Sequence, residues 1–279
     1  MAIQIKGIGK SFPQNGKQTN VLVNVNLTVN DGDFVSLLGP SGCGKSTLLN
    51  IIAGLEKSTL GEVIVDQQVV TGPASDRVMV FQEAALFPWL SVIDNVMFGL
   101  KIKGVSSKQA EEMAQETLKM VHLGRFTKAH PHELSGGMKQ RVAIARALVM
   151  NPKYLLMDEP FGALDEQTKL LLHSELQDIW QKTKKTIIFV THSIHEAVQL
   201  SNRIVLLGTR PGRIIKEFAI PYSQPRGKND PNLTYIEGQI FDDLKVEIEK
   251  VMQEEVDHDY HVTPNRLPWS SDRDMGSHI

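Results

Sequence analysis

One glycine-rich segment constrains the fold of this chain more than any other feature of the sequence. Residues 39–47 read GPSGCGKST and fit the pattern G-x-x-x-x-G-K-[ST]. Apolar residues 34–38 predict a strand before the segment, and residues 46–53 predict a helix after it. In that setting, backbone N–H groups and the positive end of the helix surround a phosphate, Lys45 adds a cation, and the Ser46 hydroxyl can ligate Mg²⁺. This phosphate loop predicts binding of a nucleoside triphosphate by Gly39, Pro40, Ser41, Gly42, Cys43, Gly44, Lys45, Ser46 and Thr47.

The overall composition is that of a globular protein whose sequence offers no membrane span. Of 279 residues, 41% are hydrophobic and 22% are charged. The longest apolar runs fall well short of the about 20 residues needed to cross a bilayer, and the N-terminus lacks the apolar core of a signal peptide. The 30 basic and 32 acidic residues leave a net charge of −2, so we expect no nucleic-acid partner.

Cys43 is the only cysteine, and it lies inside the phosphate loop. No intrachain disulfide can form, which suits a reducing compartment. The residue has two interpretations, either a tolerated small side chain or a thiol whose alkylation blocks nucleotide binding.

The order of predicted elements indicates an α/β fold. Strands are predicted at residues 2–7, 21–29, 34–38, 61–65, 77–81, 153–157, 186–190 and 202–207, with a polar loop at 13–20. Helices are predicted at residues 46–53, 91–123 with a break at Gly104, 136–150, 167–183 and 194–200. Strands that alternate with helices in this way predict a mainly parallel sheet.

The C-terminal part of the chain has a different character. A linker rich in Pro, Gly and Asn follows residue 221. Residues 234–256 place Ile240, Leu244, Ile248 and Val251 on one face of a predicted helix. This helix is expected to pack on the rest of the chain or on a partner, and the last residues are expected to form a loose tail.

An acidic pair ends one of the predicted core strands. Asp158 and Glu159 follow an apolar run, and in folds of this type the carboxyl ends of the strands face the nucleotide. Asp158 can hold Mg²⁺, and Glu159 can orient the attacking water or take its proton. Adjacent acids are also common as solvated residues, but the phosphate loop upstream favours the catalytic interpretation.

His192 closes another core strand at its carboxyl end. It can donate a hydrogen bond to the γ-phosphate or to the attacking water, although a lone histidine is more often structural or simply exposed. His195 is a competing candidate that we expect to lie on the following helix.

Residues 134–141, read as LSGGMKQR, form a second candidate anion site. Ser135, Gly136 and Gly137 open a predicted helix and present free N–H groups, a hydroxyl and a helix dipole. A plain N-cap is the simpler interpretation, but glycines directly after a cap weaken a helix by about 0.5–1 kcal/mol each. One chain thus offers one phosphate loop and one separate anion clamp.

This signature segment, in its order relative to the other motifs, resembles the signature of ABC ATPases. The resemblance covers residues 2–220 and implies a P-loop NTPase cassette at 1–220. The implied cassette has a mainly parallel core sheet, an antiparallel β subdomain and a helical signature subdomain at about residues 88–150. Residues 221–279 then hold the linker, the amphipathic helix and the tail. Met138 stands where the commonest form of the signature has glutamine, and we expect little effect on hydrolysis.

The resemblance also implies roles for individual residues. ATP and Mg²⁺ are the expected cofactors. The expected catalytic residues are Lys45, Gln82, Glu159 and His192, and the expected metal ligands are Ser46, Gln82 and Asp158. Phe12 matches the aromatic residue that stacks on adenine, and Asp165 matches an aspartate that crosses a dimer interface. Two such cassettes, identical or homologous, would pair head to tail, with each ATP between one phosphate loop and the partner's Ser135, Gly136 and Gly137.

Within that family, residues 81–96 and 158–168 look most like the ATPases of importers for nitrate, sulfonates and taurine. This implies integral-membrane permease subunits that contact the region from Gln82 to Leu90, and a periplasmic or extracellular binding protein that acts indirectly. The expected location is the cytoplasmic face of the inner membrane. The apolar cluster at residues 86–90 is interpreted either as this docking groove or as ordinary core.

Two other classes of P-loop protein fit the sequence less well. An ABC-type ATPase that acts on DNA or the ribosome usually carries a long coiled coil or two cassettes, and this chain has neither. A switch GTPase predicts the guanine-specific motif N-K-x-D, which is absent from the sequence, and neither it nor a P-loop kinase would explain the signature segment.

Overall fold

The computed structural model describes residues 2–14, 17–162, 164–224, 226 and 230–255. The side chains of residue 14 and of residues 251–255 are outside this description. The predicted tail, part of the predicted linker and the side chain of Val251 therefore lie outside the described residues.

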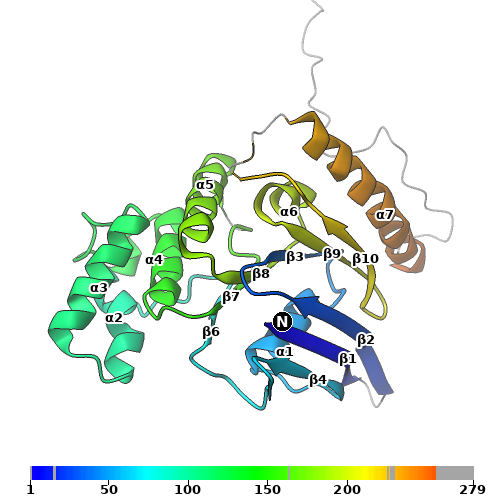
Figure 1. The fold of residues 1–279 in the computed structure, drawn as a ribbon, viewed down its shortest axis with the longest axis horizontal. Coiled ribbons are helices and arrows are strands. Elements are labelled where there is room, and N and C mark those ends of the chain that lie inside the picture. Colours follow the sequence, from blue (N-terminus) through cyan, green and yellow to red (C-terminus); the bar gives the residue numbers. More distant parts are fainter. Residues whose placement is uncertain (1, 15–16, 163, 225, 227–229, 256–279) are drawn as a thin grey trace, which may run out of the picture.

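The main sheet has six strands in the order β10-β9-β3-β8-β7-β6 (Figure 1). All neighbours are parallel except β10, which runs antiparallel to β9. Both faces of the sheet are covered, and this accounts for the uninterrupted apolar runs of its inner strands. The predicted mainly parallel sheet is confirmed, whereas β10 was not predicted. The strands are β3 (Phe34–Leu38), β6 (Arg77–Val80), β7 (Tyr154–Asp158), β8 (Thr186–Thr191), β9 (Arg203–Gly208) and β10 (Arg213–Ala219).

A second sheet is antiparallel throughout, in the order β2-β1-β4-β5. Its strands are β1 (Ile3–Gln14), β2 (Lys17–Val29), β4 (Leu60–Val65) and β5 (Gln68–Val69). The predicted polar loop at residues 13–20 is wrong, because Pro13 pairs with Gln18 and residues 17–20 belong to β2. These polar residues extend an exposed hairpin, in which cross-strand pairing outweighs the turn-like composition.

Helices cover the main sheet and form a lobe at one end of it. The helices are α1 (Lys45–Ala53), α2 (Val92–Ile102), α3 (Ser107–Met120), α4 (Gly136–Leu148), α5 (Glu166–Thr183), α6 (Ile194–Leu200) and α7 (Pro231–Glu255), with a 3-10 turn at Pro131–Glu133. The stretch predicted at 91–123 forms α2 and α3, separated by a turn in which Gly104 has φ +77°. Ser106 caps α3 by accepting a hydrogen bond from the Gln109 N–H. Figure 1 shows α2, α3 and α4 together, away from β1, β2 and β4.

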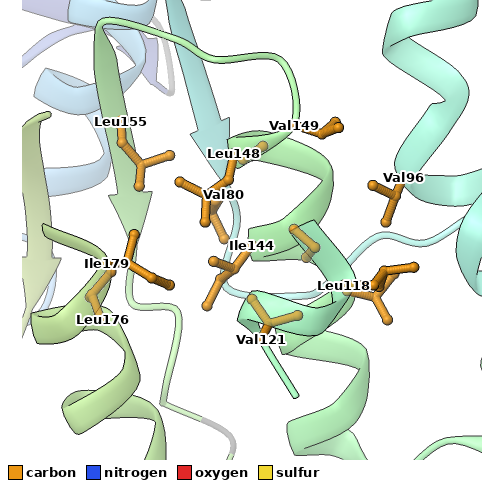
Figure 2. Close-up of a cluster of buried hydrophobic side chains, with 14 of the residues drawn as sticks. Val80, Val96, Leu118, Val121, Ile144, Leu148, Val149, Leu155, Leu176 and Ile179 are labelled. Atoms are coloured by element: carbon orange, nitrogen blue, oxygen red, sulfur yellow. The ribbon is translucent and has the colours of Figure 1, made fainter. Parts of the chain in front are cut away.

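One apolar core joins this helical lobe to the main sheet. Figure 2 shows Ile144 and Leu148 of α4 among side chains from both parts. Val80 and Leu155 come from the sheet, and Leu118 comes from α3. Because such a core is close-packed, α4 is held at a defined position relative to the strands that carry the acidic pair.

Candidate nucleotide-binding site

The phosphate loop connects β3 to α1 and packs tightly against two strands. Gly44 has φ +92°, and a Cβ there would lie 2.6 Å from Cδ2 of Leu22 in β2. A Cβ on Gly39 would lie 2.5 Å from the carbonyl oxygen of Leu207 in β9. Only glycine fits both positions, so these two glycines of the loop follow from its close approach to the Leu22 side chain and to the Leu207 backbone.

Lys45 places a buried cation inside the loop. Its side-chain nitrogen donates hydrogen bonds to the carbonyl oxygens of Gly39 at 2.8 Å and Pro40 at 2.9 Å. Gly44 stands at the N-cap of α1 and provides no side-chain cap, which leaves the first N–H groups of the helix for an anion. The pocket at this point is lined by Val21, Ser41, Gly42, Gly44, Lys45, Ser46, Thr47 and Glu159.

Ser46 and Asp158 meet at the edge of this pocket. The Ser46 hydroxyl donates to Oδ1 of Asp158 at 2.9 Å. Burial and the charge of Glu159 raise the pKa of Asp158. They outweigh the Ser46 hydrogen bond and the charge of Lys45, which act to lower it. A hydroxyl and a carboxylate are the hard oxygen donors that Mg²⁺ takes, since this ion fills most of its coordination with water and phosphate oxygens. The residues present therefore fit a magnesium ion.

Glu159 and His192 are brought together although they are 33 positions apart in the chain. Oε2 of Glu159 lies 3.0 Å from Nδ1 of His192. The Glu159 backbone has φ +41°, an uncommon value for a residue with a side chain, and its N–H donates to the carbonyl oxygen of Val190. The pocket wall thus includes Glu159, whose carboxylate contacts the largely exposed side chain of His192.

Behind His192 lies a buried network that the sequence reasoning missed. The Thr191 hydroxyl donates to Oε2 of Glu196 at 2.6 Å and accepts from the Ser193 N–H at 3.0 Å. Oε1 of Glu196 lies 3.6 Å from Nε2 of His173 on α5. Burial acts to raise the pKa of Glu196, but His173 and the Thr191 hydrogen bond outweigh it and hold the pKa below its usual range. These hydrogen bonds link the residues on both sides of His192, directly or through Thr191, to the Glu196 carboxylate.

His195 takes no part in this network. It lies on α6, as expected, and its Nδ1 is 2.9 Å from Oε1 of Glu237 in α7. That hydrogen bond raises the pKa of His195.

The signature segment forms the exposed start of α4. Ser135 is the N-cap, and its hydroxyl accepts the Met138 N–H at 3.3 Å. A Cβ on Gly137 would collide with the Thr168 methyl group of α5, so this glycine is required for packing. Met138 is half-buried against the core of the helical lobe, which accounts for an apolar residue there. Within the described part of the chain, no residue of this segment lines the phosphate pocket.

Asp165 is engaged within its own helix. It caps α5 by accepting the Thr168 N–H at 3.0 Å and the Thr168 hydroxyl at 2.7 Å. These hydrogen bonds lower the pKa of the exposed carboxyl. Thr168 touches both Asp165 and the position of Gly137, so the cap of α5 and the start of α4 are in direct contact.

Phe12 lies near the outer end of β1. It pairs with Thr19 of β2, two positions before the pocket residue Val21, and the register of the two strands shifts between these positions. Phe12 is 37% exposed, and the Lys10 ammonium lies 4.5 Å from the centroid of its ring. An aromatic surface is therefore exposed near this end of β1.

Residues 82–90 are held by side chains that the sequence reasoning did not single out. Asn95 is fully buried in α2, accepts the Phe87 N–H at 2.9 Å and donates to the carbonyl oxygens of Phe87 and Leu90. Arg146 of α4 donates to the carbonyl oxygens of Ala84 and Ala85. A lone asparagine in an apolar helix face was the available signal for Asn95.

The side chains of the same region divide between core and surface. Leu86 packs against the core of the helical lobe, whereas Trp89 is 72% exposed. Gln82 is exposed at the end of β6, beside Gly162. The core interpretation therefore holds for Leu86, and the docking interpretation stays a prediction for the exposed Trp89.

None of the described helices is long and apolar enough to cross a bilayer.

Comparison with known proteins gave concordant matches. The sequence profile of the ABC transporter family matches residues 22–162. The nitrate import ATP-binding protein NrtD of Synechocystis sp. is 49% identical over 236 residues, which is 84% of this chain and 88% of that protein. The aliphatic sulfonates import ATP-binding protein SsuB of Bacillus cereus is 46% identical over 242 residues, 86% and 94% of the two chains. A solved ATP-binding cassette, dimeric in a post-hydrolysis state with ADP and phosphate, superimposes with a TM-score of 0.71 at 36% identity, over 79% of this chain and 100% of that one.

Proposed function

This chain belongs to the ABC transporter family and is an ATP-binding ATPase, and on that premise we propose that it supplies the energy for an importer of small substrates. The energy supply in this proposal rests on one arrangement of side chains, and its use for import rests on the similarity to importer ATPases. Ser46 and Asp158 meet at 2.9 Å, Glu159 and His192 meet at 3.0 Å, and both pairs stand at the carboxyl edge of the sheet beside the phosphate loop. A site that only bound nucleotide would not need the second pair.

In the proposed mechanism, the protein mainly positions and stabilises charge. Lys45 and the N–H groups at the start of α1 bind the β- and γ-phosphates. Ser46, Asp158 and Gln82 would hold Mg²⁺, which when bound would neutralise phosphate charge. Glu159 orients the attacking water, and His192 keeps that carboxylate in place through its 3.0 Å contact.

The proposed working unit is a head-to-tail dimer of this chain or of two homologous cassettes. Ser135 and Gly136 are exposed and apart from the phosphate pocket of their own chain, which supports a role toward a partner's nucleotide. The dimeric state of the cassette solved with ADP and phosphate, at 36% identity, supports a dimer as the working unit. Asp165 would then reach across the interface from the cap of α5, and Phe12 would stack on adenine.

The proposed contact with a permease is made by residues 82–90. Asn95 and Arg146 hold this backbone rigidly, and Trp89 projects from it. Such a fixed apolar surface suits a short helix of an integral-membrane subunit. The proposed location is accordingly the cytoplasmic face of the membrane, with residues 1–220 as the cassette and 221–279 as its C-terminal extension.

The proposed substrate is a small anion of the nitrate or alkanesulfonate type. The similarity to NrtD and SsuB supports it, because their names give these substrates. A permease and a binding protein would select the substrate.

Purification of the tagged full chain from membranes, followed by reconstitution with the co-purified permease, tests this function. We expect ATP hydrolysis to rise several-fold with the permease and uptake of nitrate or an alkanesulfonate to depend on ATP. Trp89→Asp should abolish co-purification, whereas Leu60→Asp, at the similarly exposed Leu60 in β4, should not. The proposal would be refuted if the rate of ATP hydrolysis were the same with and without the permease and if Trp89→Asp still co-purified with the permease.

A further inference from the structure

The connection between β9 and β10 lies directly against the phosphate loop. A Cβ on Gly39 would lie 2.5 Å from the Leu207 carbonyl oxygen, and a Cβ on Gly212 would collide with the Cys43 carbonyl oxygen. Gly212 also exchanges backbone hydrogen bonds with β2, donating to Val21 and accepting from Val23, both at 2.9 Å. Residues 207–212, named here the backing turn, therefore support the loop and the adjacent pocket wall.

The C-terminal helix α7 holds the backing turn through one buried carboxylate. Glu247 is 3% exposed, and its Oε2 accepts the Thr209 N–H at 3.0 Å. Its Oε1 lies 3.1 Å from the Arg213 guanidinium, directly after the turn, and 2.5 Å from the Lys250 ammonium. A Cβ on Gly208 would lie 2.7 Å from Oε2, so the close fit extends to the backbone.

Apolar packing connects α7 to the strand that precedes the phosphate loop. Ile240 and Leu244 are buried in one cluster that also contains Leu38, the last residue of β3, together with residues of α6 and β9. The helix is thus linked to the nucleotide loop through this shared cluster and, more directly, through the backing turn.

The carboxylate is more than a means of attaching the helix. Ile240 and Leu244 already bury an apolar face, and a buried carboxylate is costly unless it is paired and hydrogen-bonded. Burial acts to raise the pKa of Glu247, but the hydrogen bonds from Lys250 and Thr209 and the charge of Arg213 outweigh it. The group is therefore an anion at neutral pH, and it is bonded to a turn that lies against the phosphate loop.

We propose that Glu247 is a positioning residue for nucleotide binding: by holding the backing turn, it makes α7 a structural part of the ATP site. This inference rests on the proposed assignment of the phosphate loop as that site. By thermodynamic linkage the coupling is reciprocal, so nucleotide in the loop tightens the backing turn and the part of α7 around Glu247. The C-terminal extension then has a function beyond covering the sheet.

Titration calorimetry of the full-length chain with ADP and Mg²⁺ tests the proposal. We expect Glu247→Ala to raise the dissociation constant about tenfold, which corresponds to about 1.4 kcal/mol. Glu247→Gln keeps an acceptor for the Thr209 N–H and should recover most of the affinity. In ATP hydrolysis, the change should appear in KM, with kcat within about twofold, because the residue does not touch the reacting groups.

Asp243→Ala is the matched control. Asp243 lies one turn earlier on α7 and ties the helix to β10 through a 2.8 Å contact with Lys216, away from the backing turn. It should leave ADP affinity unchanged. Equal affinity in Glu247→Ala and the unaltered chain, or an equal loss in Asp243→Ala, would overturn the inference, whereas failure of the unaltered chain to bind ADP would overturn the proposed function itself.

Hydrogen exchange on the unaltered chain provides a test that does not depend on a folded variant. ADP should slow exchange in peptides that cover residues 207–213 and the part of α7 around Glu247, as well as in the phosphate loop. Protection confined to the phosphate loop would contradict the proposed coupling.

Discussion

Two helix starts in this molecule are built from similar residues but differ in how much of a binding site each one completes. The phosphate loop leads into α1 and the signature segment leads into α4, and both contain glycines at the N-terminal end of a helix. The first is enclosed by β2, β9 and Glu159, with a buried lysine among its own carbonyl oxygens. The second is exposed, and its N-cap hydroxyl is already bonded to the Met138 N–H.

The difference shows that a helix dipole with glycines does not by itself make a site. At α1 the surrounding strands leave no room for a side chain at Gly39 and Gly44 and supply a pocket wall, while Lys45 and Glu159 add a cation and a carboxylate. At α4 the segment packs on one side, where Gly137 meets Thr168, while Ser135 and Gly136 are exposed. We therefore expect the phosphate loop to bind nucleotide within one chain, and the signature segment to contribute to hydrolysis only when a partner chain supplies the remaining contacts.

The largest expected effect is at the enclosed site. Glu159→Gln should lower the hydrolysis rate about 10²- to 10⁴-fold, because the carboxylate that orients water or takes its proton is lost. ATP binding, measured by calorimetry, should stay near that of the unaltered chain. Glu62→Gln, at an exposed carboxylate of β4, is the control and should be active. Near-normal turnover of Glu159→Gln would remove this residue from the mechanism.

A smaller effect is expected at the signature segment. A substitution there should lower the rate of hydrolysis and leave ADP binding nearly unchanged. In Gly137→Ala, the added methyl group collides with Thr168 and displaces the start of α4, so hydrolysis should fall about 10- to 100-fold. ADP affinity of the single chain should change by less than about twofold, since the phosphate loop is untouched.

Thr168→Ser removes the methyl group in question and keeps the hydroxyl that Asp165 accepts. The double variant Gly137→Ala with Thr168→Ser should therefore recover much of the lost turnover. A parallel loss of ADP affinity and turnover in Gly137→Ala would show that the two helix starts are not independent.

The smallest effect is expected at Cys43, inside the loop. The thiol is fully buried, and burial raises its pKa above the ordinary value despite the lowering influence of the Lys45 charge. A buried thiol with a raised pKa is a poor nucleophile, so a thiol reagent should label the native chain far more slowly than the unfolded one. Cys43→Ala should hydrolyse ATP within about twofold of the unaltered rate. Rapid labelling of the native chain with loss of ATP binding would favour the reactive-thiol interpretation.

Local patterns were sufficient for most of the fold. Apolar runs predicted the inner strands of the parallel sheet because strands buried on both faces carry few polar residues. The break at Gly104 was predictable because it depends on neighbouring backbone alone. The pairing of residues 13 and 14 with 17 and 18, and strand β10, were not predictable, since both depend on a partner strand for their hydrogen bonds.

The candidate site divides in the same way. The sequence by itself determined which chemical groups are available: the phosphate loop, the acids Asp158 and Glu159, His192 and the signature segment, each recognisable from residue type and spacing. Only the tertiary structure decided which groups meet and what holds them, such as Glu196 behind His192, Asn95 and Arg146 beneath residues 82–90, and Glu247 on the backing turn. The physical reason is that a buried polar side chain is placed by partners far away in the chain, and its need for hydrogen bonds leaves no local pattern in the sequence.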